Sequence, residues 1–460
     1  MRYIGIDLGT SFIKGAALDL DALQIEGIER VPFPEPIPGL DPAFREFDPR
    51  EVVAAARSLL ERLLRDAPDA AGIVICSQLH GLVFTNDAGE PVSNVINWQD
   101  QRALQPFPGG DGSYFDEINR RLTAEERREL GNEPRPGVPL CYLFWLAQNR
   151  LLPAQSAVAA ALPAFVVANL CGCPPKSDVT NAFAHGALNI ESLSWHRPVI
   201  EKLGLSAVRW PEIVAQGAVV GEYRVGSRRL PVFAPVGDYQ CSQVGAFLDE
   251  GEMSVNISTG SAVIQLARHR EFGDFQTRPW FDGRFLKTIT HIPGGRALNA
   301  LVRLLSELAT AQGLGLRDPW DYILAEAAKL ASTDLRVDPA FYFSALGNRG
   351  ALTNVREENL TVGHLFHAAF SGMADNYARC ATRLSPGRDW TRLVFSGGVA
   401  LKTPLLRRLI CDRLGQTHRL AASEEDTLLG LLALSRTFSG RSPSVVHAVA
   451  FAREHYQTTT

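Results

Sequence analysis

The chain has no long hydrophobic run and no marked excess of charge of one sign. Its longest apolar stretch, residues 157–170, is too short to cross a bilayer and contains Pro163, so it predicts a buried helix. Lysine and arginine number 46 against 50 aspartates and glutamates, which gives a net charge of −4. This balance gives no indication of a nucleic-acid or membrane surface, so we expect neither as a partner.

Cysteine forms no framework in this sequence. Of the seven cysteines, Cys171 and Cys173 are close together, but no second pair or nearby histidine completes a zinc pattern. We expect reduced, mostly buried thiols of a cytoplasmic protein. The amino-terminal segment has no basic region followed by an apolar core, so no signal peptide is predicted.

The length of 460 residues and a hydrophobic content of 46% predict two or three domains with full cores. Strands alternate with helices in both halves, a pattern typical of α/β proteins. Residues 49–66 have apolar positions at helical spacing behind a capping Asp48, and residues 72–76 form a short strand. Further helices are predicted at residues 296–312, 320–331, 361–383, 402–414 and 427–438. A seam at 237–251 divides domains 1–245 and 246–460.

The first motif is a predicted β-hairpin formed by residues 3–8 and 12–18. Its tip carries Asp7, Thr10 and Ser11, with Lys14 on the second strand. A carboxylate there can hold the waters of Mg²⁺, while hydroxyls and backbone N–H groups at a glycine turn can hold phosphate oxygens. An ordinary Asp-Gly turn is the alternative, because short motifs also occur by chance.

A second hairpin repeats this pattern with residues 253–257 and 262–267, joined by Ser258, Thr259 and Gly260. Thr10 and Thr259 lie more than half of the chain apart, far beyond the period of about 20 to 50 residues of a solenoid repeat. The repeat indicates two similar domains that face each other. Such domains would hold a phosphate between them.

Polar residues cluster after two further strands, in residues 76–81 and 95–102. Candidate ligands for a polyhydroxy compound are Gln78, His80, Trp98, Asp100 and Arg102. Polar groups would serve the hydroxyls of a sugar, and an indole face would serve its C–H side. The alternative is a surface strand end beside a core tryptophan.

Asp238 follows a predicted strand at the seam and precedes Tyr239. A carboxylate there could accept the proton of an attacking hydroxyl, as an aspartate does in phosphoryl transfer. A helix N-cap is an equally ordinary role for such a residue. The sequence does not separate the two interpretations.

Two glycine pairs, Gly294-Gly295 and Gly397-Gly398, each precede a predicted helix. Glycine lets the backbone approach a flat base, a ribose or a phosphate closely. A tight turn into a helix explains each pair nearly as well.

Taken together, these segments resemble the FGGY carbohydrate kinases, which share their fold with actin and chaperone ATPases. The order and spacing of six motifs carry the resemblance across nearly the whole chain: residues 7–11, 77–81, 98–102, 237–238, 258–260 and 396–398. The resemblance implies two ribonuclease-H-like domains with a catalytic cleft between them, the first binding sugar and the second ATP.

Within this family the chain is most similar to the sedoheptulokinase branch, in segments such as 97–100, 143–146 and 237–240. This implies phosphorylation of sedoheptulose to sedoheptulose 7-phosphate, with xylulose, ribulose or another polyol as alternatives. An actin-like ATPase would need no acceptor pocket. A sugar-sensing homologue without activity would have lost Asp7 or Asp238, and both are present.

The resemblance also implies residue roles. Asp238 would be the general base and Asp7 would bind Mg²⁺ through water, while Thr10, Ser11 and Lys14 would contact ATP. Tyr239 would line the sugar pocket beside the candidates above. On the ATP side the expected contacts are Thr259, Gly260, Gly294, Gly295, Gly397 and Gly398.

Three positions depart from the family pattern. Ser258 replaces a usual glycine, Tyr142 a common lysine and Thr403 a frequent asparagine, so Thr403 is left out of the predicted site. A homodimer is a further expectation.

Overall fold

The computed structural model of the chain describes residues 1–153, 157–315 and 317–458. These residues form two compact units. The first unit contains residues 1–247, 277–285 and 425–460, and the second contains 248–276 and 286–424. The chain therefore enters the second unit, returns briefly to the first, and ends in the first.

A seven-stranded sheet forms the centre of the first unit, in the order β13-β14-β5-β1-β2-β3, with β15 also paired to β5. The predicted first hairpin is confirmed, because β1 and β2 pair antiparallel from Arg2 with Asp19 to Leu8 with Ile13. The strands are β1 (Arg2–Leu8), β2 (Phe12–Asp19), β3 (Gln24–Pro32), β5 (Ile73–Ser77), β13 (Val219–Val225), β14 (Arg228–Phe233) and β15 (Val236–Gly237).

Three parallel strands of this sheet end side by side. Leu8 of β1 is paired with Ser77 of β5, and Ser77 is paired with Gly237 of β15. Parallel neighbours place their carboxyl ends at one edge of a sheet. The segments that follow, residues 9–11, 78–81 and 238–240, therefore leave the sheet at the same edge.

Helix α1 (Pro49–Asp66) begins and ends as predicted, and the Asp48 side chain accepts a hydrogen bond from the Arg50 N–H. Its apolar stripe packs into the core of the unit with strands β1 and β5.

The single helix predicted over 157–170 is wrong in its first part. Residues Val158–Ala161 form β8, which pairs antiparallel with β6 (Leu82–Thr85). The helix α5 begins only at Leu162, with Pro163 in its first turn and Gly172 in a left-handed conformation at its end. Proline suits the first turn of a helix, where its missing N–H is not needed. The sequence did not reveal this change from strand to helix, because residues 157–170 are uniformly apolar. A fully buried strand and a fully buried helix cannot be distinguished by the spacing of their apolar residues.

Smaller elements complete the middle of the first unit. Strands β4 (Glu46–Phe47), β7 (Val95–Ile96), β6 and β8 form a four-stranded sheet. The remaining elements are η1 (Arg102–Leu104), α2 (Tyr114–Arg121), α3 (Ala124–Glu129), α4 (Pro139–Gln148), β9 (Lys176–Ser177), α6 (Val179–Ala184), β10 (Leu188–Asn189), β11 (Ser194–Trp195), α7 (Arg197–Lys202) and β12 (Glu212–Ile213).

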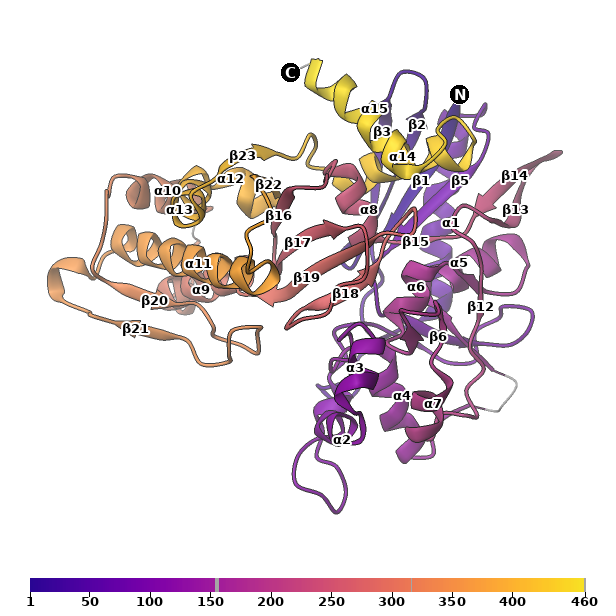
Figure 1. Cartoon of the computed structure of the whole chain (residues 1–460), viewed down its shortest axis with the longest axis horizontal. Helices are drawn as coiled ribbons and strands as arrows, with labels where there is room; N and C mark the ends of the chain where they lie inside the picture. Colours follow the sequence, from indigo (N-terminus) through magenta and orange to yellow (C-terminus); the bar gives the residue numbers. More distant parts are fainter. Residues whose placement is uncertain (154–156, 316, 459–460) are drawn as a thin grey trace. The chain divides into compact units, whose positions relative to one another are not determined.

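Both ends of the chain belong to the first unit. Figure 1 shows α14 (Asp426–Phe438) and α15 (Val445–Thr458), in yellow, beside the amino-terminal strands. Helix α14 also packs closely on α8 (Asp238–Gly245) through glycines. A Cβ atom on Gly245 would lie 1.8 Å from the Asp426 carbonyl oxygen, and one on Gly430 would lie 2.1 Å from that of Cys241.

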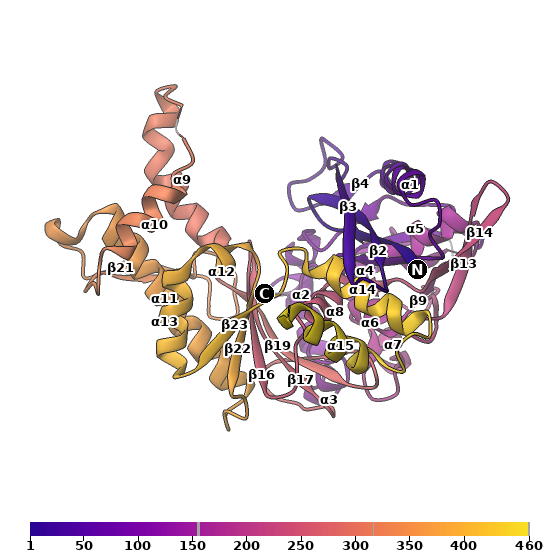
Figure 2. The ribbon, with the colours of Figure 1, turned by 90° about the horizontal axis from the view of Figure 1, so that it is seen from above.

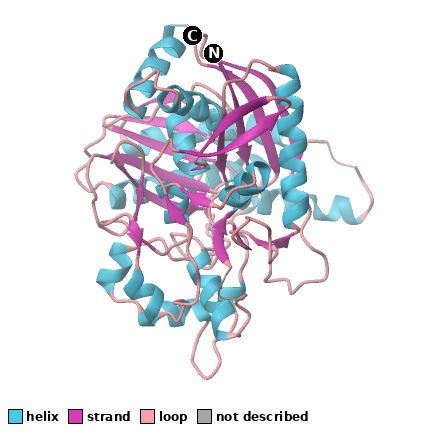
Figure 3. Cartoon of the chain, turned by 90° about the vertical axis from the view of Figure 1, so that its right-hand side faces the viewer, coloured by secondary structure: helices cyan, strands magenta, loops and turns pink. Residues whose placement is uncertain are grey.

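The second unit is built on five strands that pair in the order β19-β17-β16-β22-β23. The second predicted hairpin is confirmed by β16 (Glu252–Ile257) and β17 (Ser261–Ala267), which pair antiparallel. The other strands of this unit are β19 (Phe285–Ile292), β22 (Arg392–Ser396) and β23 (Thr417–Leu420). Strand β18 (Gln276–Pro279), which pairs with β19, lies almost wholly in the segment 277–285 of the first unit. Figure 3 shows the helices in cyan around the strands in magenta.

The helices predicted for the second half are confirmed with boundary shifts of a few residues. Figure 2 shows α11 and α13 beside β22 and β23, while α9 extends outward from the sheet. The bounds are α9 (Gly295–Ala311), α10 (Trp320–Ala328), α11 (Val362–Leu384), α12 (Gly398–Lys402) and α13 (Pro404–Leu414), with β20 (Arg336–Asp338), β21 (Ala351–Thr353) and η2 (Glu357–Asn359). One apolar core joins α11 to the strands of this sheet.

All seven cysteines lie in described parts of the chain and are free thiols, as expected. Within the described ranges, no helix is long and apolar enough to cross a membrane.

The close approach of α8 and α14 gives a stability prediction. We expect Gly245→Ala to lower the free energy of unfolding by about 2–3 kcal/mol, because the methyl group must push the helices apart. Urea unfolding followed by circular dichroism measures this change. The matched control is Gly387→Ala, where a Cβ atom meets nothing within 4 Å, and its expected effect is below about 0.5 kcal/mol. Equal effects of the two substitutions would contradict the packing argument.

Candidate functional site

Asp7 lies at the end of β1 and is buried with one carboxylate oxygen unpaired. Its Oδ2 accepts a hydrogen bond from the Thr427 hydroxyl at 2.7 Å and lies 3.3 Å from the Lys14 ammonium. Its Oδ1 is buried and has no hydrogen-bond partner in the structure. A buried carboxylate oxygen without a partner carries a large desolvation cost, so this atom is suited to a ligand.

Asp238 is the first residue of α8, not its cap. Gly237 occupies the N-cap position, so the alternative interpretation of Asp238 as a helix cap is wrong. Burial, together with the nearby Asp7 carboxylate, raises the pKa of Asp238 to about 8. The side chain keeps part of its surface exposed. A carboxyl group with a pKa near the pH of the cell is suited to accept a proton during a reaction.

A third carboxylate, Asp426 at the start of α14, was missed by the sequence analysis. Burial raises its pKa to about 7; the Lys14 ammonium opposes this increase, whereas Asp7 adds to it. The neighbouring Glu425 accepts a hydrogen bond from Lys14 at 3.0 Å. The available signal was the pair of acids that directly precedes the helix predicted at 427–438, but nothing in the sequence placed it beside Asp7.

These three carboxylates fit a hydrated divalent cation. Asp7 raises the pKa values of both Asp238 and Asp426, which indicates an excess of negative charge, and Asp7 Oδ1 lacks a partner. Among the residues that the structure describes, no three histidine, cysteine, aspartate or glutamate side chains are grouped to ligate a metal directly. Magnesium usually keeps several waters and takes few protein ligands, so this arrangement suits it.

The Thr10 hydroxyl connects the first hairpin to two candidate sugar residues. It donates to Gln78 Oε1 at 3.2 Å and accepts from the Trp98 indole N–H at 3.0 Å. Trp98 is 39% exposed, so its ring face is open while its N–H is held. Gln78 is buried and also donates to the Gly9 carbonyl. Ser11 is exposed at the same turn.

His80 is held in a left-handed backbone conformation, with φ of 66°, which is uncommon for a residue with a side chain. Its Nδ1 lies 2.7 Å from the Ala184 carbonyl oxygen, which can only accept, so Nδ1 carries the proton. The Tyr142 hydroxyl donates to the His80 carbonyl at 3.1 Å. Tyr142, which replaces the common lysine, therefore supports His80 from a buried position.

A charged cluster beside His80 was not predicted. Glu133 is completely buried and accepts hydrogen bonds from Arg278 and Arg135. The Arg278 guanidinium also lies over the Tyr239 ring, 4.5 Å from its centroid. Although burial opposes ionisation, the two arginines hold the pKa of Glu133 well below its usual range. Loop residues and a short strand far along the chain give no sequence signal for such a cluster.

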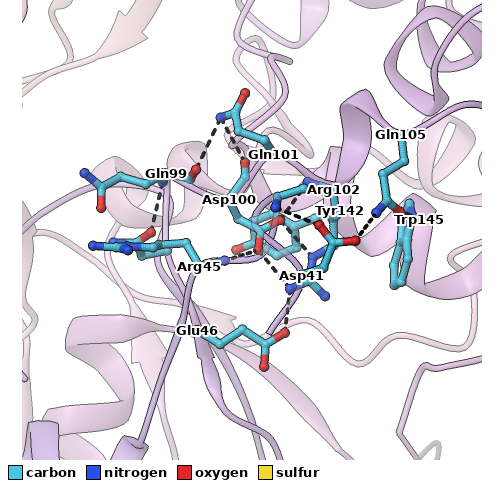
Figure 4. Close-up of polar contacts among 12 residues, drawn as sticks. Asp41, Arg45, Glu46, Gln99, Asp100, Gln101, Arg102, Gln105, Tyr142 and Trp145 are labelled. Carbon is cyan, nitrogen blue, oxygen red and sulfur yellow. Dashed lines mark hydrogen bonds and ion pairs between the residues drawn. The ribbon is translucent and has the colours of Figure 1, made fainter. Parts of the chain in front are cut away.

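Asp100 and Arg102 lie inside a buried network instead of facing solvent. Arg102 donates to both carboxylate oxygens of Asp100 at 2.8 Å, and to Glu46. Its guanidinium also lies over the Phe44 ring at 4.3 Å. Figure 4 shows this network, which fixes the segment that follows Trp98. Direct contact of Asp100 or Arg102 with a sugar stays a prediction.

The second unit contains a cavity of about 750 Å³ around the predicted ATP residues. Thr259, Gly295 and Gly398 line it, together with Ser258. Thr403, which the sequence analysis left out, also lines the cavity. So do residues for which no motif gave a signal: Asn299, Asp318, Trp320, Asp321, Leu324, Val399 and Lys402.

The neighbouring glycines permit close approach of backbone segments at this cavity. A Cβ atom on Gly294 would lie 2.2 Å from the Ser261 hydroxyl, and Gly397 has a positive φ of 84°. The first N–H groups of α9 donate to the Ser258 and Thr259 carbonyls, so the helix supports this loop. A Cβ on Gly260 would meet nothing within 4 Å. The prediction that Thr259 faces Thr10 across two domains stays a prediction.

Comparison with known proteins gives a family match and a similar relative. Residues 2–245 match the model described as FGGY family of carbohydrate kinases, N-terminal domain. The sedoheptulokinase of Mus musculus is 25% identical over 458 residues, which cover 88% of this chain and 91% of that protein.

Two solved structures match the fold of nearly the whole chain. A ligand-bound xylulose kinase from Lactobacillus acidophilus is 19% identical with a TM-score of 0.83, and Plasmodium falciparum glycerol kinase with ADP is 18% identical with a TM-score of 0.84. Each match covers 98% of this chain and 92% of the other.

The chain therefore belongs to the FGGY family of carbohydrate kinases. It has the two-domain, actin-like ATPase fold that the motifs predicted. It is a phosphotransferase that uses ATP to phosphorylate a sugar.

The raised pKa of Asp238 predicts a stability effect that depends on pH. Its folded-state pKa lies above the unfolded value of 3.8, so the carboxyl group increasingly destabilises the fold as pH rises toward 8. The Tm values of Asp238→Asn and the wild type are compared at pH 5 and pH 9 with EDTA present. We expect the Tm of the variant, relative to that of the wild type, to be at least about 2 °C higher at pH 9 than at pH 5.

Asp116 provides the control because hydrogen bonds from Ser113 lower its pKa. The Asp116 carboxylate contributes its full stabilisation at any pH above its unfolded-state pKa. The change in Tm caused by Asp116→Asn should therefore be the same at pH 5 and pH 9. The argument would be contradicted if the Tm difference between Asp238→Asn and the wild type were the same at pH 5 and pH 9.

Proposed function

We propose that this kinase transfers the γ-phosphoryl group of ATP to a primary hydroxyl of a ketose, with sedoheptulose giving sedoheptulose 7-phosphate. The observation that carries the proposal is the partly exposed Asp238, whose pKa is raised to about 8, at the sheet edge that also presents Asp7, Gln78 and His80. The match to sedoheptulokinase over most of both chains favours this ketose.

The acceptor is proposed to bind to the first unit. The exposed indole of Trp98 would cover the C–H side of the sugar, and Gln78, His80 and Tyr239 would meet its hydroxyl groups. Asp238 would accept the proton of the attacking hydroxyl. Its raised pKa favours that transfer, because the proton passes to a group of matched basicity.

The nucleotide is proposed to bind in the cavity of the second unit. This assigns residues 1–245 mainly to the sugar and 246–460 mainly to ATP. Thr259 and Thr10 would contact the phosphates, and Lys14 would add positive charge. Closure of the two domains would exclude water, which competes with the sugar as acceptor.

Asp7 would hold a hydrated Mg²⁺, with Asp238 and Asp426 contributing negative charge nearby. The ion would neutralise charge on the phosphates of ATP. We also infer a cytoplasmic location, supported by the free cysteines. A homodimer stays a prediction.

A substrate panel tests the proposed function. The protein is incubated with Mg-ATP and sedoheptulose, xylulose, ribulose, fructose or glycerol, while ADP release is followed. We expect the highest kcat/KM with sedoheptulose and a loss of at least about 100-fold in kcat for Asp238→Asn. Higher activity on another acceptor would overturn the substrate assignment. Full activity of Asp238→Asn would overturn the assignment of Asp238 as the general base.

Magnesium dependence tests the role of Asp7. We expect Asp7→Asn to increase the Mg²⁺ concentration needed for half-maximal rate by at least about tenfold, because the negative charge of the carboxylate is lost. The rate is measured against Mg²⁺ concentration at constant ATP. Glu425→Gln is the control, since Glu425 also pairs with Lys14. Identical Mg²⁺ curves for Asp7→Asn and the wild type would refute the assignment.

A further inference from the structure

Glu133 and Arg278 form a buried, two-pronged ion pair in the first unit. Arg278 Nη2 lies 2.9 Å from Glu133 Oε1, and its Nε lies 3.2 Å from Oε2. Arg278 belongs to the segment 277–285, which interrupts the second unit in sequence but packs with the first. The Thr277 N–H also donates to the Gly131 carbonyl, so this segment is attached beside the loop that carries Glu133.

One end of the pair meets His80. The His80 Nε2 atom lies 3.3 Å from Glu133 Oε1, while its Nδ1 is bound to the Ala184 carbonyl. A carboxylate oxygen can only accept, so Nε2 faces it best when it carries a proton. The two oxygen acceptors together fix the plane of a ring whose backbone is already constrained at positive φ.

The other end of the pair meets Tyr239. The Arg278 guanidinium lies over the Tyr239 ring at 4.5 Å, a cation–π contact. Because Tyr239 directly follows Asp238, the orientation of its ring is linked to the first turn of α8. Arg278 and Glu133 are themselves 2% and 0% exposed, so neither reaches solvent.

We propose that Glu133 and Arg278 form a positioning pair that orients His80 and Tyr239 for the sugar and so determines acceptor affinity without touching the acceptor. This inference rests on the proposed function, and specifies which residues shape the acceptor subsite. Buried ion pairs contribute little net stability but can restrict the conformations available to neighbouring groups. The two side chains held by this pair are partly exposed candidates for sugar contact.

Steady-state kinetics on the full-length protein test the pair. Removing Glu133 or Arg278 alone leaves the other as a buried charge without its partner, so the informative variant is the double substitution Glu133→Gln with Arg278→Gln. Arg135, which also donates to Glu133, has a partly exposed side chain and stays charged in this variant. We expect the KM for the sugar to rise at least about tenfold, while the KM for ATP changes less than about twofold. The smaller variant Arg278→Lys keeps the charge but loses the two-pronged geometry, and should lie between the double variant and the wild type.

Glu252 of the second unit supplies a matched control. It is also a buried carboxylate with two arginine partners, Arg392 at 2.6 Å and Arg419 at 2.7 Å. None of these residues is a candidate for sugar contact. We expect Glu252→Gln to lower the Tm while both KM values stay within about twofold of the wild type.

The ¹⁵N signals of the His80 ring give a readout that does not depend on turnover. We expect the ¹⁵N chemical shift of His80 Nε2 to differ between the wild type and the double variant, because the Glu133 carboxylate that lies 3.3 Å from Nε2 is replaced by an amide. A folded double variant with unchanged sugar KM and unchanged His80 signals would overturn the positioning role. If the wild type phosphorylates no sugar on the panel, the proposed function fails, while the His80 signals still decide whether the pair orients this ring.

Discussion

The concentration of carboxylates at one edge of the first sheet is the constraint on which the site depends. Asp7, Asp238 and Asp426 come from three distant parts of the chain, and burial with mutual repulsion raises the pKa values of Asp238 and Asp426. Such an arrangement costs stability and persists because the surrounding fold holds it. In the proposed function, the same repulsion would supply a proton acceptor and an affinity for a divalent cation.

The packing around these carboxylates explains how the fold tolerates their repulsion. Helices α8 and α14 approach so closely that Gly245 and Gly430 leave no space for a side chain. This contact packs α8 against the start of α14, where Asp426 lies, and the next residue, Thr427, donates a hydrogen bond to Asp7. Buried networks around Asp100 and Glu133 hold the segments that carry Trp98 and His80, so the exposed residues of the acceptor region rest on charged residues that are themselves hidden.

Most secondary structure followed from local patterns. Alternating strands around a glycine turn predicted both hairpins, and helical spacing behind Asp48 predicted α1 to the residue. The pattern failed in residues 157–170, where strand and helix were equally apolar and only pairing with β6 decided between them. Asp238 was recognised as a candidate base, but its competing role as a helix cap was excluded only when Gly237 was found in the cap position.

By itself, the sequence determined the motifs, their order and the family, because strand alternation, helix caps and glycine turns depend on neighbours along the chain. Tertiary structure decided which distant groups meet: Asp426 with Asp7, Arg278 with Glu133, and Thr403 with Thr259 at the cavity of the second unit. Burial, charge repulsion and ion pairing depend on distances through space. No spacing along the chain encodes those distances.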